Sequence, residues 1–288
     1  MKIFFTPSVN HLKQYIPGEH GQYKLRKFND GELFFKLEEN VEKQPVTVIT
    51  ATYPPTKHFS EIFFLLDTLK QQNAVVHAIF TYFGYERQDH PKPNVARAAR
   101  IIANCFKQFE LNRITIIHPH SQLLQKEIPY ASFFPFQLYT PLIKQLEIDT
   151  IVSPDNGGIF ACQELATETN CLVGSIEKER ISNNQIIPGT INLPSGIKRA
   201  LIFDDIISTG STIIQAAIIL QEHGATDIYA IATHSFINEL ALQKIVESPV
   251  KHLWVSNSVP VYFSSPQLTV INIAPVLKQL IAHDMLNT

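Results

Sequence analysis

The chain has 288 residues, of which 45% are hydrophobic and 17% charged, which is typical of a folded protein with enough apolar residues for two domains. The formal net charge of −2 gives no electrostatic reason to expect a nucleic acid or an anionic membrane as partner. No apolar run reaches the roughly 18 residues of a membrane span, and the N-terminus turns polar too early for a signal peptide, so we expect a cytoplasmic protein.

Short apolar runs rich in β-branched and aromatic residues alternate with segments of helical periodicity. Continuous apolar runs suit strands buried on both faces of a parallel sheet, and their alternation with helices predicts an α/β fold. The predicted strands are 46–50, 75–83, 113–118, 149–154, 199–204, 228–234 and 268–273. The predicted helices are 58–71, 93–109, 158–169, 211–223 and 237–246, followed by a short amphipathic helix near the C-terminus.

The strand and helix layout occurs twice. The periodicity breaks near residue 140, where FFPFQLYTP contains two prolines. We therefore predict two domains, 1–140 and 141–288, each a mostly parallel sheet flanked by helices. The last helix is expected either to stay with the second domain or to pack back on the first.

The segment LIFDDIISTGST (201–212) joins a predicted strand to a predicted helix. Ligands of open α/β sheets bind beyond the carboxyl ends of the strands, so this loop lies at the binding edge. Its small residues and the N-terminus of the helix favour a phosphate, while Asp204 and Asp205 suit sugar hydroxyls or a metal ion. A phosphorylated sugar is thus expected. The alternative is an aspartate pair that ends a strand, followed by a Ser/Thr helix cap.

This segment resembles the phosphoribosyl-pyrophosphate (PRPP) motif shared by type I phosphoribosyltransferases and PRPP synthetases. The resemblance implies that Asp204 and Asp205 lie beside the ribose hydroxyls and that the following loop binds the 5-phosphate. The implied loop residues are Ser208, Thr209, Gly210, Ser211 and Thr212.

Four further segments resemble signatures of the PRPP synthetases alone, in the family's order: KFNDGEL (27–33), YFGYERQDH (82–90), IVSPDNGG (151–158) and IEKER (176–180). The chain is thereby identified as a member of the ribose-phosphate diphosphokinase family, closest in style to the short archaeal-type enzymes. The resemblance implies two tandem phosphoribosyltransferase-like domains. It also implies transfer of the β,γ-diphosphoryl group of ATP to the anomeric hydroxyl of ribose 5-phosphate, giving PRPP and AMP.

The resemblance also implies the roles of single residues. Lys178 and Arg180, which follow the strand-like CLVGSI, stabilise charge on the transferring group, and Arg180 also contacts ribose 5-phosphate. His120 and Asp155 are the implied Mg²⁺ ligands. The implied ATP-binding residues are Phe28, Asp30, Gly31, Glu32, Arg87 and Gln88, the first four reaching ATP from a neighbouring subunit of a homo-oligomer, a dimer or hexamer.

Two other functions stay open from sequence. A PRPP-consuming phosphoribosyltransferase explains 201–215 but leaves 27–33 and 82–90 without a role. A non-catalytic regulatory paralogue has mild support from the segment 90–100, which lacks the S-R-x-P-I-[ST] run of the long family members. The retained Lys178, Arg180, His120 and Asp155 argue against it. For an active enzyme, the same departure predicts weak or absent regulation by ADP and phosphate.

Overall fold

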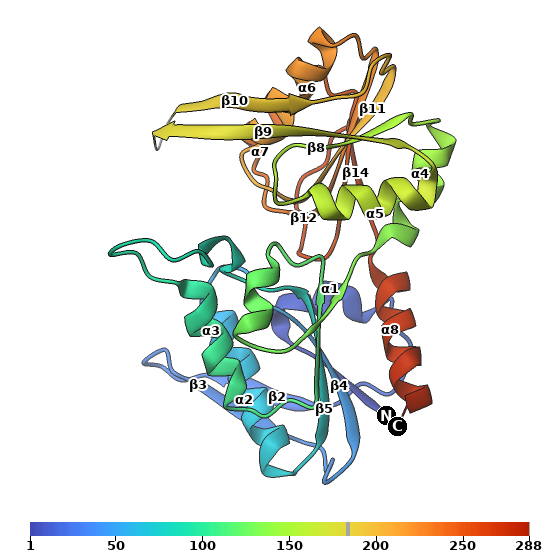
Figure 1. The fold of residues 1–288 in the computed structure, drawn as a ribbon. Coiled ribbons are helices and arrows are strands. Elements are labelled where there is room, and N and C mark those ends of the chain that lie inside the picture. Colours follow the sequence, from blue (N-terminus) through green and yellow to red (C-terminus); the bar gives the residue numbers. More distant parts are fainter. Residues whose placement is uncertain (183–184, 288) are drawn as a thin grey trace. The chain divides into compact units, whose positions relative to one another are not determined.

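The computed structural model describes residues 1–182 and 185–287, and the side chains of all of these except 177–182, 185–189 and 285–287. The chain divides into two compact units (Figure 1). Unit 1 comprises residues 1–133 together with the chain from Ala274 onward, and unit 2 comprises residues 134–273. In chain order, unit 2 is therefore inserted between two parts of unit 1.

Unit 1 is built around a parallel sheet with the strand order β1-β4-β5-β6-β7 among the described residues. The strands are β1 (Lys2–Phe5), β4 (Pro45–Ala51), β5 (Val75–Tyr82), β6 (Arg113–Ile117) and β7 (Ala131–Phe133). The helices are α1 (Asn10–Lys13), α2 (Lys57–Gln71), α3 (Ala98–Lys107) and α8 (Ala274–Asn287). A hairpin of β2 (Tyr23–Lys27) and β3 (Leu33–Leu37) adds an antiparallel pair.

The two faces of this sheet are covered by different helices (Figure 1). Successive strand residues point to opposite faces. Val46 and Val48 of β4 pack in one core with apolar residues of α2 and α3. Thr47, between them, points to the other face and contacts Asp284 of α8 at 3.5 Å. Strand β4 is thus buried on both sides, as its continuous apolar sequence predicts.

Helix α8 is fixed to the sheet by a buried polar cluster. Nδ1 of His77 bonds Oδ2 of Asp284, and Nε2 of the same ring lies 2.8 Å from the Thr115 hydroxyl. Arg113 donates to Oδ1 of Asp284 at 3.1 Å. His77 and Asp284 are nearly inaccessible to solvent. The cluster therefore joins β5, β6 and α8 across more than half of the chain.

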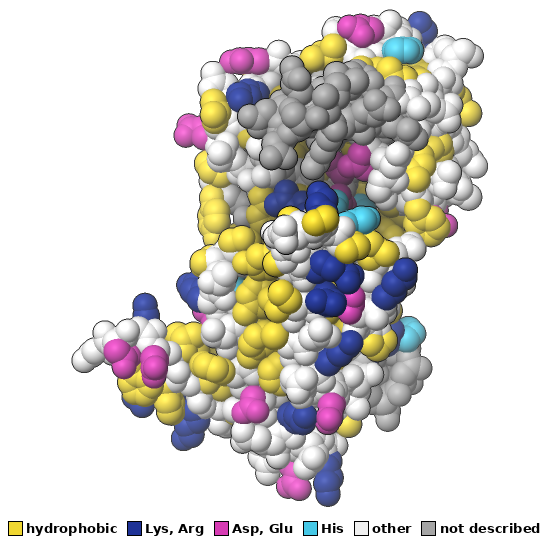
Figure 2. Space-filling model, turned by 60° about the vertical axis from the view of Figure 1, so that its left-hand side comes forward, with side chains coloured by type: hydrophobic (Ala, Val, Ile, Leu, Met, Phe, Trp, Pro, Cys, Tyr) yellow, Lys and Arg dark blue, Asp and Glu magenta, His cyan; other side chains and the backbone are white. Residues whose placement is uncertain are grey.

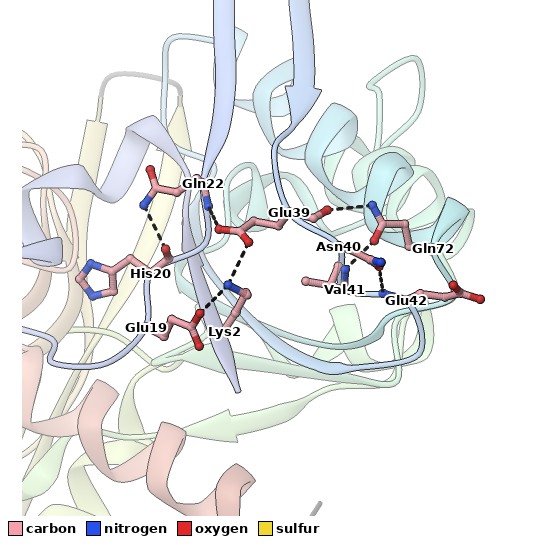
Figure 3. A network of polar contacts seen from close by, with 9 residues as sticks. All are labelled: Lys2, Glu19, His20, Gln22, Glu39, Asn40, Val41, Glu42 and Gln72. Atoms are coloured by element: carbon pink, nitrogen blue, oxygen red, sulfur yellow. Dashed lines mark hydrogen bonds and ion pairs between the residues drawn. The ribbon is translucent and has the colours of Figure 1, made fainter.

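The hairpin of β2 and β3 is anchored at its base by a polar network (Figure 3). The Lys2 ammonium group bonds Glu19 at 2.5 Å and Glu39 at 2.9 Å. The second Glu39 oxygen accepts the backbone N–H of Gln22 at 3.1 Å, and Gln72 donates to the Glu39 carbonyl. Both ends of the hairpin are thereby tied to β1 and to the end of α2.

Unit 2 contains a sheet with the strand order β10-β9-β8-β11-β12-β13-β14 among the described residues, parallel except for the β9–β10 pair. The strands are β8 (Thr150–Ser153), β9 (Leu172–Ser182), β10 (Gln185–Asn192), β11 (Arg199–Ile207), β12 (Asp227–Ser235), β13 (His252–Ser256) and β14 (Leu268–Ile271). The helices are α4 (Thr140–Gln145), α5 (Ile159–Thr169), α6 (Ser211–Glu222) and α7 (Glu239–Val246).

The central strand β11 is buried on both faces. Leu201 and Phe203 pack in a core with residues of α4 and α5, while Ala200 and Ile202 pack in another core with residues of α6 and α7. The predicted α/β fold with mostly parallel sheets is confirmed. Within the described part of the chain, none of the helices combines the length and apolar character that crossing a bilayer requires.

The structure corrects several predicted boundaries. Strand β11 continues to Ile207, beyond the predicted end at residue 204, so Asp205 also lies inside the strand and not in the loop after it. Helix α3 begins at Ala98 and not at residue 93, because two prolines and the left-handed Asn94 (φ 58°) precede it. The strands missed by the sequence prediction are β1, β2, β3, β7, β10 and β13, and β9 extends beyond the strand expected at CLVGSI.

Candidate functional site

The carboxyl end of β11 carries the predicted sugar-phosphate residues. Asp204 is 6% exposed, and its Oδ1 accepts the backbone N–H of Asp205 at 2.9 Å. The strand ends at Ile207, and α6 begins at Ser211, whose hydroxyl lies 3.0 Å from that of Thr209. The structure therefore brings together the acidic pair, the hydroxyl-bearing loop and the N-terminus of a twelve-residue helix.

Gly210 determines the shape of this loop. Its φ of 75° lies in the left-handed region, which side chains rarely adopt. A Cβ at this position would also lie 2.9 Å from side-chain atoms of Ile245 in α7. A glycine is therefore required for the loop to turn tightly against α7 and to direct the N–H groups of α6 outward.

Three carboxyl groups influence one another at this edge of the sheet. Burial raises the pKa of Asp204 well above its ordinary value, and the neighbouring charges of Asp205 and Asp155 raise that pKa further. Crowded carboxylates disfavour their own ionisation, so a cation or a hydroxyl donor bound here relieves the repulsion. This is the electrostatic environment expected for sugar hydroxyls or a metal ion.

Asp155 is held in a tight turn between β8 and α5. Its Oδ1 accepts the backbone N–H groups of Gly157 at 2.9 Å and Gly158 at 3.1 Å. The buried Ser153 hydroxyl donates to the Asp155 carbonyl at 2.6 Å. Behind this turn, burial raises the pKa of Cys162, whose thiol donates to the Phe203 carbonyl. The turn therefore fixes the direction of the Asp155 carboxylate.

In unit 1, the predicted residues Arg87, Gln88 and His120 follow the carboxyl ends of β5 and β6. Arg87 and Gln88 are exposed and lie in a 3-10 turn, residues 86–88. His120 is half-buried, and its backbone N–H donates to Oε2 of Glu86 at 2.9 Å. Because β5 and β6 are parallel neighbours, the structure brings these two turns together.

The segment after Arg87 is positively charged and is tied down at both ends. Asp89 is buried, yet its pKa is lowered, because hydrogen bonds from Ser121 and His90 outweigh the effect of burial. Arg97 donates to the Asp89 carbonyl at 3.0 Å and to Glu127 at 3.1 Å. Figure 2 shows lysine and arginine side chains gathered on the face of unit 1 that carries α3. Such a surface suits an anionic ligand.

The predicted residues Phe28, Asp30, Gly31 and Glu32 form the turn at the outer end of the β2–β3 hairpin (Figure 1). The Phe28 N–H donates to the Glu32 carbonyl at 2.8 Å, and the Glu32 N–H donates to Oδ1 of Asp30 at 3.0 Å. Gly31 has a φ of 101°, and Phe28 is 46% exposed. The turn thus presents an aromatic ring and carboxylates to solvent, beside a surface hollow of about 800 Å³.

Lys178 and Arg180 lie in β9, which pairs with β10 so that Lys178 is opposite Pro188 and Arg180 is opposite Ile186. Their side chains lie outside the described residues. The backbone of β9 pairs antiparallel with β10 and continues the strand that the sequence predicts only at its start.

The carboxylates of unit 2 fit the Mg²⁺ that the resemblance implies. Mg²⁺ prefers oxygen ligands and is commonly held by one or two carboxylates together with substrate phosphates and water. Asp155, oriented by two backbone amides, and the crowded Asp204 provide such oxygens. The described residues contain no cluster of three or more histidine, cysteine or acidic side chains able to hold a metal by themselves. His120 belongs to unit 1 and Asp155 to unit 2.

Two mostly parallel sheets flanked by helices, with an acidic pair near the end of β11 and a hydroxyl loop after it, define an enzyme of the phosphoribosyltransferase-like α/β class. Two family models match the chain. The N-terminal domain of ribose phosphate pyrophosphokinase matches residues 3–109, and the phosphoribosyl synthetase-associated domain matches residues 175–284. The chain belongs to the ribose-phosphate pyrophosphokinase family, which confirms the family identified from the motifs.

Curated relatives match along almost the whole chain. A ribose-phosphate pyrophosphokinase from Oceanobacillus iheyensis is 30% identical, covering 99% of this chain and 95% of the relative. One from Sulfurisphaera tokodaii is 32% identical, covering 88% and 89%. Among solved structures, the phosphoribosylpyrophosphate synthetase from Mycobacterium smegmatis matches with a TM-score of 0.85 and 26% identity, covering 100% of this chain and 99% of that one.

The structure reveals two buried carboxyl groups, Glu86 and Asp89, that the sequence alone does not mark as site residues. They lie within YFGYERQDH beside the predicted Arg87 and Gln88. A local signal existed, because acidic residues directly after a continuous apolar strand are either exposed or bonded. Their partners, in the turn after β6, could not be identified without the order of the strands.

Proposed function

We propose that the chain catalyses the reaction of ATP with ribose 5-phosphate, giving AMP and PRPP. One observation carries the proposal: an acidic pair near the end of β11, the buried Asp204 and the half-buried Asp205, is followed by a hydroxyl-rich loop at the N-terminus of α6. That arrangement suits a ligand with hydroxyls at one end and phosphate at the other. The match to ribose-phosphate pyrophosphokinases over nearly the full chain supports synthesis of PRPP over its consumption.

In unit 2, we assign ribose 5-phosphate to the β11 edge. The loop residues bind the 5-phosphate through hydroxyl and backbone N–H groups, while Asp204 and Asp205 accept hydrogen bonds from the ribose hydroxyls. Lys178 and Arg180 neutralise charge on the diphosphoryl group during transfer. Phosphoryl transfer depends mainly on positioning and charge neutralisation, which fits cationic side chains without a nucleophile. The loop residues concerned are Ser208, Thr209, Gly210, Ser211 and Thr212.

In unit 1, we assign ATP to the cationic edge that carries Arg87 and Gln88. The guanidinium group can bond phosphate oxygens or stack on adenine. His120 and Asp155 are assigned to Mg²⁺, which supplies charge neutralisation at the phosphates of ATP. The exposed cations near Arg87 support this assignment.

We also propose that the protein forms a homo-oligomer, and the proposal rests on the turn of the β2–β3 hairpin. Phe28, Asp30, Gly31 and Glu32 lie at the outer end of β2 and β3, where an exposed aromatic ring is available to stack on an adenine. We assign these residues to the ATP site of a neighbouring copy, so that full activity requires at least a dimer.

A cytoplasmic location, where ATP is abundant, fits this reaction.

The test is a direct assay with the purified protein. It is incubated with ATP, Mg²⁺ and ribose 5-phosphate, and both AMP and PRPP are measured. Equal amounts of the two products are expected. Absence of PRPP with every divalent cation tried would contradict the proposal. Binding of ATP without turnover would identify a regulatory paralogue, and release of diphosphate from PRPP and a nucleobase would identify a phosphoribosyltransferase.

A further inference from the structure

Two turns at the carboxyl edge of the unit 1 sheet both contain a residue in the left-handed region. Tyr85, after β5, has a φ of 67°, and His118, after β6, has a φ of 42°. Neither residue is glycine, so each turn carries a conformational cost of roughly 1–2 kcal/mol that surrounding contacts must offset. These are the turns that carry Arg87 and His120.

Glu86 belongs to the turn after β5 and contacts the turn after β6. Its residue surface is only 2% exposed, and its Oε2 accepts the backbone N–H of His120 at 2.9 Å. A second connection runs through Arg97, which donates to the Asp89 carbonyl at 3.0 Å and to Glu127, beyond the His120 turn, at 3.1 Å. A carboxyl group buried to this degree is costly unless it is bonded, so its position against the His120 turn has structural consequences.

We propose that Glu86 is a positioning residue for the reaction, which holds the turn bearing His120 against the turn bearing Arg87 and Gln88. The inference rests on the proposed function, because it takes His120 as a Mg²⁺ ligand and Arg87 as an ATP contact. Glu86 fixes the His120 backbone, and thereby the direction in which its imidazole leaves the chain. Because Glu86 directly precedes Arg87 in the chain, the same turn positions the Arg87 guanidinium group and the His120 imidazole.

The positioning role depends on the hydrogen bond that Glu86 accepts, and not only on the volume that its side chain fills. A side chain at position 86 without an acceptor leaves the His120 N–H without its carboxylate partner. The left-handed His118 directly before Pro119 gives the turn little freedom to relax while keeping its shape. The expected result is a shifted His120 and a weakened Mg²⁺ site, with the sheet below unchanged.

The first measurement does not depend on activity. Hydrogen–deuterium exchange of the segment 117–123 is compared between the wild-type protein, Glu86→Gln and Glu86→Ala. Glutamine keeps an acceptor oxygen, so its exchange should match the wild type. In Glu86→Ala, exchange of this segment should accelerate about ten- to hundredfold, while exchange in β5 and β6 stays unchanged. Unchanged exchange in Glu86→Ala would overturn the inference.

The second measurement is the Mg²⁺ dependence of turnover. Glu86→Ala should raise the Mg²⁺ concentration for half-maximal activity about tenfold or more and lower kcat, and Glu86→Gln should restore most of both. In a His120→Ala background, Glu86→Ala should have no additional effect on the Mg²⁺ dependence, because it acts through His120. A full additional effect in that background would contradict the proposed route.

These outcomes distinguish the inference from the proposed function. A wild-type protein that makes PRPP, with a Glu86→Ala variant of unchanged Mg²⁺ dependence, refutes only the positioning role. A wild-type protein that makes no PRPP refutes the function, while the exchange experiment still tests the connection between the turns. Should Glu86→Ala fail to fold, Glu86→Asp withdraws the carboxyl group by one methylene and should show the same changes to a smaller degree.

Discussion

Asp204 is a buried carboxyl group whose pKa is raised, first by burial and then by the charges of Asp205 and Asp155. In an unfolded chain an aspartate loses its proton near pH 3.9, at about its ordinary pKa. Between that pH and the raised pKa of the folded state, the folded protein holds a proton that the unfolded chain has lost. The ligand-free protein therefore loses stability as the pH rises through this window.

We predict that Asp204→Asn removes this pH dependence. With EDTA present and no ligand, the variant should melt at a higher temperature than the wild type at pH 8. The advantage should shrink as the pH is lowered to 4, by up to about 1.4 kcal/mol per pH unit. Thermal unfolding over this pH range measures it, with Asp67→Asn on the exposed surface of α2 as control. Parallel curves for wild type and Asp204→Asn would refute the prediction.

Lys178 is expected to act mainly in the transition state. Lys178→Ala should lower kcat by about 10²–10³ and weaken ATP binding far less, because the negative charge that it stabilises develops during transfer. Steady-state kinetics and calorimetric ATP binding measure the two effects. Lys144→Ala, on the exposed surface of α4, is the matched control. Equal losses in turnover and in ATP affinity would count against the assigned role.

At the scale of elements, the β2–β3 hairpin depends on its anchored base. Glu39 joins Lys2 and the Gln22 backbone (Figure 3), so Glu39→Ala should loosen the hairpin. We predict a rise in the KM for ATP of roughly two- to fivefold with little change in melting temperature, because the network is partly exposed. Glu42→Ala is the control, because the Glu42 carboxylate points away from Lys2, Glu39 and Gln22 (Figure 3). A variant with unchanged KM would show that the anchor does not affect the ATP site.

The buried strands could be predicted from the sequence, whereas the half-exposed ones could not. Strands such as β4 and β12 have continuous apolar runs because both faces are covered. In β2, apolar Tyr23 and Leu25 alternate with charged residues, since one face meets solvent. That period of two, followed by Asn-Asp-Gly, is a hairpin signal that a search for continuous apolar runs misses. The sequence predicts the end of β11 too early, because a buried carboxyl group such as that of Asp204 is energetically unusual within a strand.

In the candidate site too, one part could be predicted from the sequence and another could not. The β11 loop could be predicted because strand, acidic pair, glycine and helix follow one another within twelve residues of LIFDDIISTGST. The hydrogen bond between Glu86 and His120 spans 34 residues and requires β5 and β6 to be neighbours. Strand order is a property of the folded sheet, so this connection carries no local sequence signal.

At the scale of the molecule, α8 belongs to unit 1 although unit 2 precedes it in the chain. Asp284 is the central acceptor that joins α8 to His77 and Arg113. We predict that Asp284→Ala lowers the free energy of unfolding of unit 1 by about 2–4 kcal/mol, because it leaves buried polar partners without their acceptor. Urea unfolding measures this loss.

Lys278→Ala, on the exposed side of α8, controls for changes in the helix itself and should unfold like the wild type. Unit 2 should keep its stability in both variants, as monitored by the fluorescence of Trp254 in β13. Wild-type stability of Asp284→Ala would show that the apolar contacts of α8 suffice to hold it.

The insertion of unit 2 between two parts of unit 1 has a consequence for the order of folding during synthesis. Residues 134–273 leave the ribosome as one continuous segment, with every strand of their sheet present before α8 has been made. The first 133 residues must wait for α8 to cover the sheet face that carries His77. The C-terminal part of the chain can therefore mature before the N-terminal part, in the reverse of the usual sequence for nascent chains.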